Sequence, residues 1–213
     1  MMFVLDVHGQ SLVTSTALSV YYLPNAVTPL QAIQVLNAAG GRFVLVGCHS
    51  IGGWIDEPRA SEDVDVLIPA RDVHKAVREL LTAFPHLEEN EDKAFVHLRD
   101  RETRAASIDV VEPLSALLGM ALKKTCEVEV DEEEYRIPTL EMALALTFSR
   151  MKSLTWGQPK KYMDAHDFIT MVKASPAIDM RSLAMLGDLV CPGGGAEIAR
   201  SVDQARRDET LTL

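Results

Sequence analysis

Two aspartates separated by one residue, Asp63 and Asp65, follow a glycine turn at Gly47. Side chains two residues apart on a β-strand point to the same face, so both carboxylates face one side of the sheet. Asp109 lies in the apolar segment 107–112, where an ionised carboxylate is costly without a partner. Paired Mg²⁺ ions, held by carboxylate oxygens, stabilise the attacking and leaving oxygens of phosphoryl transfer. We therefore expect Asp63, Asp65 and Asp109 to bind metal and to be catalytic, with Asp109 also helping to deprotonate the acceptor.

The residues around the glycine turn are candidates for holding a phosphate group. Gly47 has no Cβ, so the backbone can approach a triphosphate and offer N–H groups, and Ser50 adds a hydroxyl. Arg59 and Ser61 come just before the paired aspartates, where they can order the loop or contact phosphate. Two simpler interpretations stay open: Gly47 merely ends a strand, and Arg59 pairs with a neighbouring carboxylate.

The elements that position these residues follow from apolar spacing and turn residues. Thr28 followed by proline predicts a helix N-terminus. The apolar run 43–46 predicts a buried central strand, and 51–55 a short helical turn. Alternation over 63–68 predicts a second strand that presents its aspartates to one face and its valines to the other.

The rest of the chain contributes further strands and then helices. Residues 107–112 predict a third strand, while 88–93 reads as a charged turn between two strands and 113–124 as an amphipathic helix. No strand precedes the glycine triplet at 193–195, so we interpret it as a linker between two helices. The acidic run 131–134 is typical of a solvated turn.

A chain of 213 residues, 47% of them apolar, is long enough for two unequal lobes. We predict an α+β, or mixed α/β, fold in which a small mixed sheet with flanking helices precedes a C-terminal helical lobe. The α/β core spans 24–137, after an extended N-terminal arm at 1–23, and the helical lobe spans 138–213.

Charge and cysteine usage narrow the range of partners and compartments. A net charge of -10 without a basic block argues against a broad nucleic-acid surface, which needs clustered Lys and Arg. A small anionic substrate remains compatible, because a bound divalent cation supplies local positive charge. The three cysteines have no CxxC spacing, and no apolar run reaches the ~20 residues that span a bilayer. We therefore expect a cytoplasmic protein without a membrane partner.

Together these segments resemble the nucleotidyltransferase superfamily signature, in which a glycine turn precedes a strand-borne acidic pair and a later strand carries a third acidic residue. The resemblance is closest to minimal nucleotidyltransferases of the AbiEii toxin kind. Its most specific part is the segment Arg59 to Asp65 with Gly47 upstream. Glu141 and the run Lys161 to Asp167 occupy the places of that family's helical motifs.

The resemblance implies a Mg²⁺-dependent enzyme, with Mn²⁺ as the alternative metal, that moves an NMP group from a nucleoside triphosphate. The acceptor is a protein, a tRNA or a small molecule, and a toxin role would imply an antitoxin partner. Cys48 and Lys161 join the implied nucleotide-binding residues. Cys48 replaces the usual glycine or serine, and Thr147 stands where a lysine is often seen. These departures favour an alternative, a catalytically degenerate protein of this fold that binds a nucleotide or a partner.

Rival phosphate-binding motifs do not fit the sequence. A phosphatase of the haloacid dehalogenase type requires Asp-x-Asp-x-Thr, but Val66 and Leu67 follow Asp65. The chain also lacks a Gly-x-Gly-x-x-Gly motif after a strand and a Gly-Lys-Ser/Thr loop. His49 beside Cys48 resembles a metal or nucleophile site only weakly, since no second histidine or cysteine recurs at ligand spacing.

Overall fold

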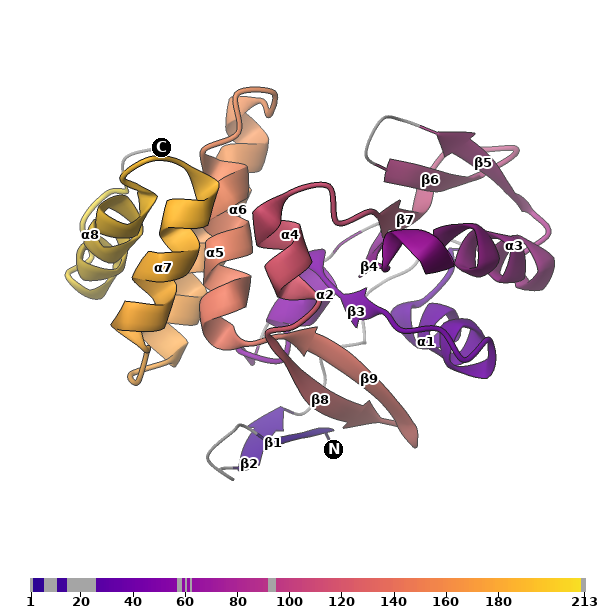
Figure 1. The fold of residues 1–213 in the computed structure, drawn as a ribbon, viewed down its shortest axis with the longest axis horizontal. Coiled ribbons are helices and arrows are strands. Elements are labelled where there is room, and N and C mark those ends of the chain that lie inside the picture. The colour runs from indigo at the N-terminus through magenta and orange to yellow at the C-terminus, as the bar shows by residue number, and fades with distance from the viewer. Residues whose placement is uncertain are drawn as a thin grey trace. The chain divides into compact units, whose positions relative to one another are not determined.

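The computed structural model describes residues 2–5, 11–14, 26–56, 59, 61, 63–91 and 95–211. Its contacts divide the chain into two compact units, residues 1–138 and 139–213 (Figure 1). Each unit is described in turn. In the described part of the chain, no helix has the length and apolar character needed to cross a membrane.

The first unit is built on a five-stranded mixed sheet, which agrees with the predicted fold class. Its strand order is β3-β4-β7-β6-β5, and β4 and β7 are parallel whereas the other neighbours are antiparallel. The strands are β3 (Val44–Leu45), β4 (Val64–Leu67), β5 (Leu87–Glu91), β6 (Phe95–Asp100) and β7 (Ala106–Val111).

Two expectations about these strands were wrong. β3 is an edge strand of two residues, not a central strand, and it is buried because β9 (Glu133–Pro138) packs against it. The predicted turn at 88–93 is mostly strand, since β5 continues to Glu91. β5 is an edge strand that pairs with β6 on one side only, and charged side chains are common on such edges. Residues 92–94 lie outside the described part.

The core of the sheet lies on one face. Val64 and Val66 of β4 and Ile108 and Val110 of β7 join one buried cluster with the apolar sides of α1 (Pro29–Ala38) and α3 (Val73–Ala83). Because side chains alternate along a strand, Asp65 and Asp109 project from the opposite face. The two aspartates therefore lie on the face of the sheet that α1 and α3 do not cover.

The helices of this unit begin largely where the sequence indicates. Thr28 forms a capping box with Gln31, in which the Thr28 hydroxyl accepts from the Gln31 backbone N–H at 3.2 Å and the Gln31 side chain accepts in return at 2.9 Å. The predicted helical turn at 51–55 is present, because Trp54 and Ile55 donate their N–H groups to the Ile51 carbonyl at 2.8 and 3.2 Å; it continues α2 (Gly47–Ile51), which begins at the glycine turn. The predicted helix at 113–124 is shorter, α4 (Ala116–Ala121), since Ser115 caps it. The short 3-10 turn η1 (Ala70–Asp72) precedes α3.

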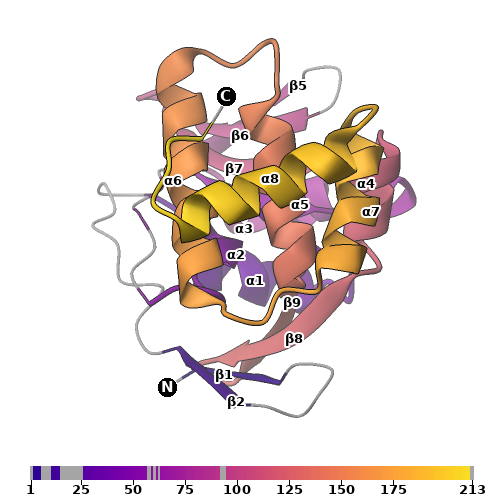
Figure 2. The ribbon, with the colours of Figure 1, turned by 90° about the vertical axis from the view of Figure 1, so that its left-hand side faces the viewer.

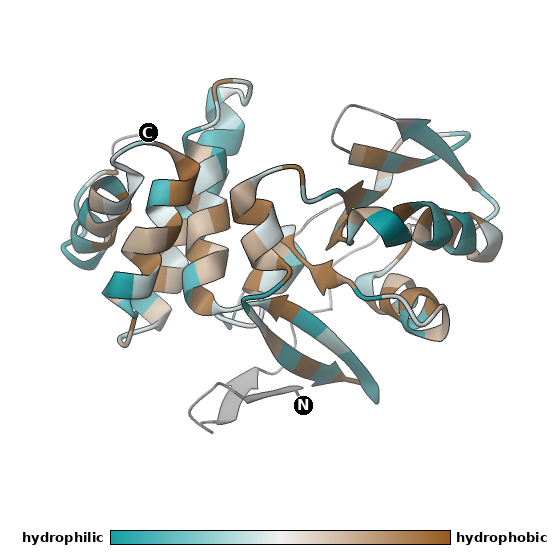
Figure 3. Ribbon diagram, viewed as in Figure 1, coloured by the Kyte–Doolittle hydropathy of each residue, from teal (hydrophilic) through white to brown (hydrophobic). Residues whose placement is uncertain are grey.

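A second, antiparallel sheet completes this unit in the order β2-β1-β8-β9. Its strands are β1 (Met2–Leu5), β2 (Ser11–Thr14), β8 (Thr125–Val130) and β9. Figure 3 shows hydrophobic and hydrophilic residues alternating along β8 and β9. The remaining residues of the predicted arm at 1–23 lie outside the described part.

The second unit contains α5 (Leu140–Met151), α6 (Gln158–Ala174), α7 (Met180–Val190) and α8 (Gly194–Arg206), and α8 packs on α6 and α7 (Figure 2). The linker interpretation of the glycine triplet was wrong for Gly194 and Gly195, which begin α8. A Cβ on Gly194 would lie 2.9 Å from the Gly187 carbonyl carbon, so glycine lets the two helix backbones touch. Asp188 accepts a hydrogen bond from the Gly195 N–H at 2.8 Å and satisfies that helix end.

Candidate active site

Three carboxylates converge on the open face of the five-stranded sheet. Asp65 on β4 is paired in register with Asp109 on the parallel neighbour β7, and Asp63 lies immediately before β4. One carboxylate oxygen from each of the three lies within 4.8 Å of the others, and all three side chains are partly buried. The structure thus brings together all three residues that the sequence singled out.

Gly47 makes room for this cluster. Its φ of +66° lies in the left-handed region, and a Cβ there would overlap Oδ2 of Asp65 and lie 2.8 Å from Cγ. The preceding residue, Val46, donates its N–H to the Asp65 carbonyl at 2.9 Å. Glycine is therefore required at this position both by the backbone conformation and by the closeness of the Asp65 carboxylate.

The segments on either side of the acidic pair hold the site by short hydrogen bonds. Ser61 donates from Oγ to Oδ1 of Asp63 at 2.9 Å. Cys48 donates from Sγ to the Arg59 carbonyl at 3.0 Å, and Ser50 donates from Oγ to the Gly47 carbonyl at 2.8 Å. Ser61 therefore orients a carboxylate directly, while Cys48 and Ser50 fix the backbone around it. The intervening residues 57, 58, 60 and 62 lie outside the described part.

His97 on β6 belongs to the site and was not predicted. Its Nδ1 lies 2.7 Å from Oδ1 of Asp109, the residue paired with it across β6 and β7. The imidazole also stacks on Phe95, with ring centroids 5.6 Å apart and 10° between the planes. The alternation of Phe95 and His97 with the buried Val96 and Leu98 was the signal that could have placed His97 on the same face as Asp109.

Two buried polar atoms near the carboxylates have no hydrogen-bond partner among the described residues. They are Nε2 of His49, a buried residue of α2, and Oγ of Ser107, which lies two residues before Asp109 on β7. Burial lowers the pKa of His49, against the opposing effect of the nearby Asp63. Burial of His49 therefore disfavours its protonated form.

The donor set fits a hard divalent cation. Three carboxylates this close repel one another unless a cation or a proton lies among them. Mg²⁺ and Mn²⁺ prefer oxygen ligands, and Mg²⁺ binds by a few carboxylates together with water and substrate phosphates. The cluster therefore has the composition of a site for a hard divalent cation.

The motif that the sequence placed in the second unit lies on α6. Asp164 and Asp167 are both buried, and Arg150 of α5 donates from Nε to Oδ1 of Asp164 at 2.8 Å. Arg150 also reaches the buried Thr147 hydroxyl at 3.4 Å. Asp164 thus pairs with an arginine of the neighbouring helix, while Lys161, one turn earlier, is partly exposed. The Arg150–Asp164 ion pair joins α5 to α6.

Comparisons with known proteins show a similarity in fold alone. No protein-family model and no curated protein matches the chain. Its structure is similar to that of an antigenic nucleotidyltransferase-like protein from Paracoccidioides brasiliensis, with a TM-score of 0.52 and 16% identity, over 86% of this chain and 92% of that one. A weaker match is JHP933 from Helicobacter pylori, with a TM-score of 0.47 and 13% identity over 84% of this chain and 88% of that one. Another is the antibiotic-resistance factor ANT(2'')-Ia, with a TM-score of 0.46 and 12% identity over 84% of this chain and 90% of that one. The first of these similarities, together with the mixed sheet described above, shows that the chain has a nucleotidyltransferase-like fold.

Proposed function

We propose that this protein is a Mg²⁺-dependent nucleotidyltransferase, which transfers an NMP group from a nucleoside triphosphate to an acceptor. The observation that carries the proposal is the group of three carboxylates, Asp63, Asp65 and Asp109, within 4.8 Å of one another on the open face of a nucleotidyltransferase-like sheet. The residue types of the cluster alone do not specify this reaction. The combination of an all-oxygen donor set with this fold supports it.

In this mechanism the three aspartates would hold the metal, which would neutralise phosphate charge and stabilise the attacking and leaving oxygens. Asp65 and Asp109 are fixed by strand pairing, and Asp63 by the hydrogen bond from Ser61. An acceptor oxygen bonds to the α-phosphorus, the bond to pyrophosphate breaks, and the acceptor proton passes to Asp109 or to solvent. His97 acts as a positioning residue, since its bond to Oδ1 of Asp109 restricts the rotamer of that carboxylate.

The remaining predicted residues would hold the triphosphate. The side chains of Cys48 and Ser50 bond to backbone carbonyls, so we place their contribution, like that of Gly47, in the backbone N–H groups of this turn. Arg59 is the proposed counter-charge for phosphate oxygens, and Lys161 stays a predicted nucleotide-binding residue of the second unit.

The direct experiment is incubation with each labelled nucleoside triphosphate and Mg²⁺ or Mn²⁺, in the presence of protein, tRNA and small-molecule acceptors. We expect label to appear in one acceptor class and to be lost in Asp63→Ala/Asp65→Ala. The matched control is Asp203→Ala, which removes an exposed carboxylate of α8. Equal labelling by the wild type and the double variant would contradict the proposal, as would failure of the wild type to bind any triphosphate by isothermal titration.

A second candidate is a nucleotide- or partner-binding module without catalysis. It is favoured by Cys48, whose buried thiol faces the Arg59 carbonyl, and by Thr147, which is buried at the place of the family's lysine. Triphosphate binding that depends on Asp63 and Asp65, without labelling of any acceptor class, would select this candidate over the enzyme.

The AbiEii-like subtype and a toxin role extend the proposal on the strength of the Arg59–Asp65 and Lys161–Asp167 motifs. Induced expression in a bacterial host tests the toxin role. Growth arrest by the wild type, but not by Asp63→Ala/Asp65→Ala at equal protein level, is the expected result. Unimpeded growth with the wild type would remove the toxin role and leave the nucleotidyltransferase proposal intact.

A further inference from the structure

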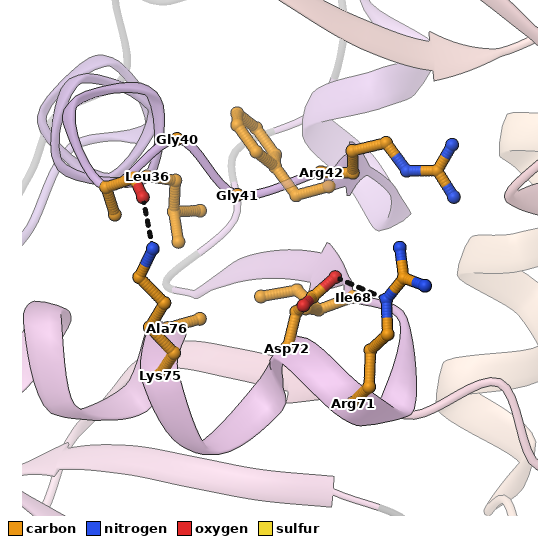
Figure 4. Close-up of a pocket in the computed structure, with 11 residues that line it drawn as sticks. Leu36, Gly40, Gly41, Arg42, Ile68, Arg71, Asp72, Lys75 and Ala76 are labelled. Atoms are coloured by element: carbon orange, nitrogen blue, oxygen red, sulfur yellow. Dashed lines mark hydrogen bonds and ion pairs between the residues drawn. The ribbon is translucent and has the colours of Figure 1, made fainter.

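A separate pocket of about 170 Å³ lies beyond the C-terminal end of β4. Its walls come from the end of α1, the approach to β3, the residue after β4, η1 and the first turn of α3 (Figure 4). β3 and β4 are antiparallel, so the pocket residues Phe43 and Ile68 lie at one end of this pair and Gly47 and Asp65 at the other. The pocket shares no residue with the carboxylate site.

The pocket has an apolar floor and a charged rim. The floor is made by buried side chains, namely Leu36, Phe43, Ile68 and Ala76. The rim carries three cations, Arg42, Arg71 and Lys75, and one carboxylate, Asp72. Three positive charges and one negative charge leave a net +2 on the rim, in a chain whose net charge is -10. A concave, low-dielectric wall concentrates such a field, so the pocket attracts anions.

The two arginines have donors to spare, whereas Lys75 is already engaged. Lys75 donates from Nζ to the Ala39 carbonyl at 2.7 Å and so offsets the negative end of α1. Arg71 makes a long contact of 3.5 Å from Nε to Asp72. Within the described part of the chain, Arg42 has no hydrogen-bond or ion-pair partner. Figure 4 shows both guanidinium groups extending to the same side of the pocket.

From this arrangement we propose that the pocket binds a small phosphate-bearing ligand between Arg42 and Arg71. Guanidinium groups present paired N–H donors that match the oxygens of phosphate. A rim charge of +2 matches the charge of a phosphate dianion better than it matches the charge of a ligand with a single carboxylate. The volume is well below the ~300 Å³ at which drug-sized ligand pockets begin, so the ligand is inorganic phosphate or a short phosphate ester whose few carbons rest on the apolar floor. This inference is independent of the proposed function.

The test is a titration of the isotope-labelled full chain with inorganic phosphate in the presence of EDTA, which excludes metal-assisted binding. Binding is monitored through the NMR signals of the backbone amides. We expect saturable shifts at residues 40–43 and 71–75. Arg42→Gln and Arg71→Gln should each raise Kd about tenfold, the usual loss for a charge-assisted hydrogen bond. Methyl phosphate should shift the same amides if the site accepts an ester.

Two controls separate this site from the rest of the protein. Arg78→Gln removes an exposed arginine of α3 that pairs with Glu79 outside the pocket, and it should leave Kd unchanged. Asp63→Asn/Asp65→Asn should also bind phosphate normally, whatever its effect on nucleotides. The proposal is overturned if phosphate shifts none of the pocket amides, if the shifts cluster around the aspartates, or if Arg71→Gln binds as tightly as Arg78→Gln.

Discussion

Replacing Gly47 with alanine should disable the carboxylate site while the protein stays folded. The left-handed backbone at φ +66° costs an L-residue ~1–2 kcal/mol. The new Cβ also overlaps Oδ2 of Asp65, and forcing extra volume into a packed position costs a further ~1–3 kcal/mol. Since Asp65 can relieve the overlap only by moving its carboxylate, the site loses a ligand. We expect Mn²⁺ affinity, measured by titration calorimetry, to fall at least about tenfold.

Gly40 provides a matched control for this experiment. It has the same φ of +66°, but a Cβ there meets no atom within 4 Å. Gly40→Ala should therefore show only the backbone cost, which is a drop in Tm of roughly 2–8 °C for a chain of this size, and should bind Mn²⁺ like the wild type. If Gly47→Ala and Gly40→Ala have equal Tm and equal Mn²⁺ affinity, the closeness of Gly47 to Asp65 has no consequence and the reasoning is refuted.

Three further changes test other contacts. His97→Phe keeps a ring beside Phe95 but removes the hydrogen bond to Asp109, so Mn²⁺ affinity should fall about tenfold. His97→Asn should restore part of this affinity. Equal affinity in the wild type and both variants would exclude the positioning role. Arg150→Met removes the ion pair between Arg150 and the buried Asp164 carboxylate and should lower the free energy of unfolding by roughly 3 kcal/mol in urea titrations. A change below about 0.5 kcal/mol would mean that Asp164 does not depend on Arg150. Burial raises the pKa of Tyr135 to about 12, so the folded protein disfavours the tyrosinate. The contribution of this group to stability is intact below pH 10 and should fall by roughly 3 kcal/mol between pH 10 and 12, a loss that Tyr135→Phe should not show.

The parts of the fold that local chemistry determines were predictable from the sequence. Thr28, Pro29 and Gln31 specify a helix start without help from the rest of the chain, and the alternation around Asp63 and Asp65 specifies which face their side chains share. The choice of Asp109 as a third member rested on an ionised side chain in an apolar run, and the structure places it beside Asp65.

The missed features depend on contacts between distant segments. His97 meets Asp109 through a hairpin whose register shifts at Leu98 and Arg99, and a bulge of this kind is not encoded by a single residue type. The role of Gly194 depends on Gly187 lying opposite it on another helix. In both cases the residue type was visible, but its partner was fixed only by tertiary packing.

The parallel pairing of β4 and β7 has a consequence for how this protein can diverge. Between the paired residues Asp65 and Asp109 the chain leaves the strand pair, forms α3 and the β5–β6 hairpin, and then returns. Their spacing is set by strand register and not by the length of that excursion, so insertions at the hairpin tip can accumulate without separating the two carboxylates. A single-residue insertion within β4 would instead turn Asp65 toward the core. Length variation among natural variants should therefore concentrate at the hairpin tip and spare the two strands.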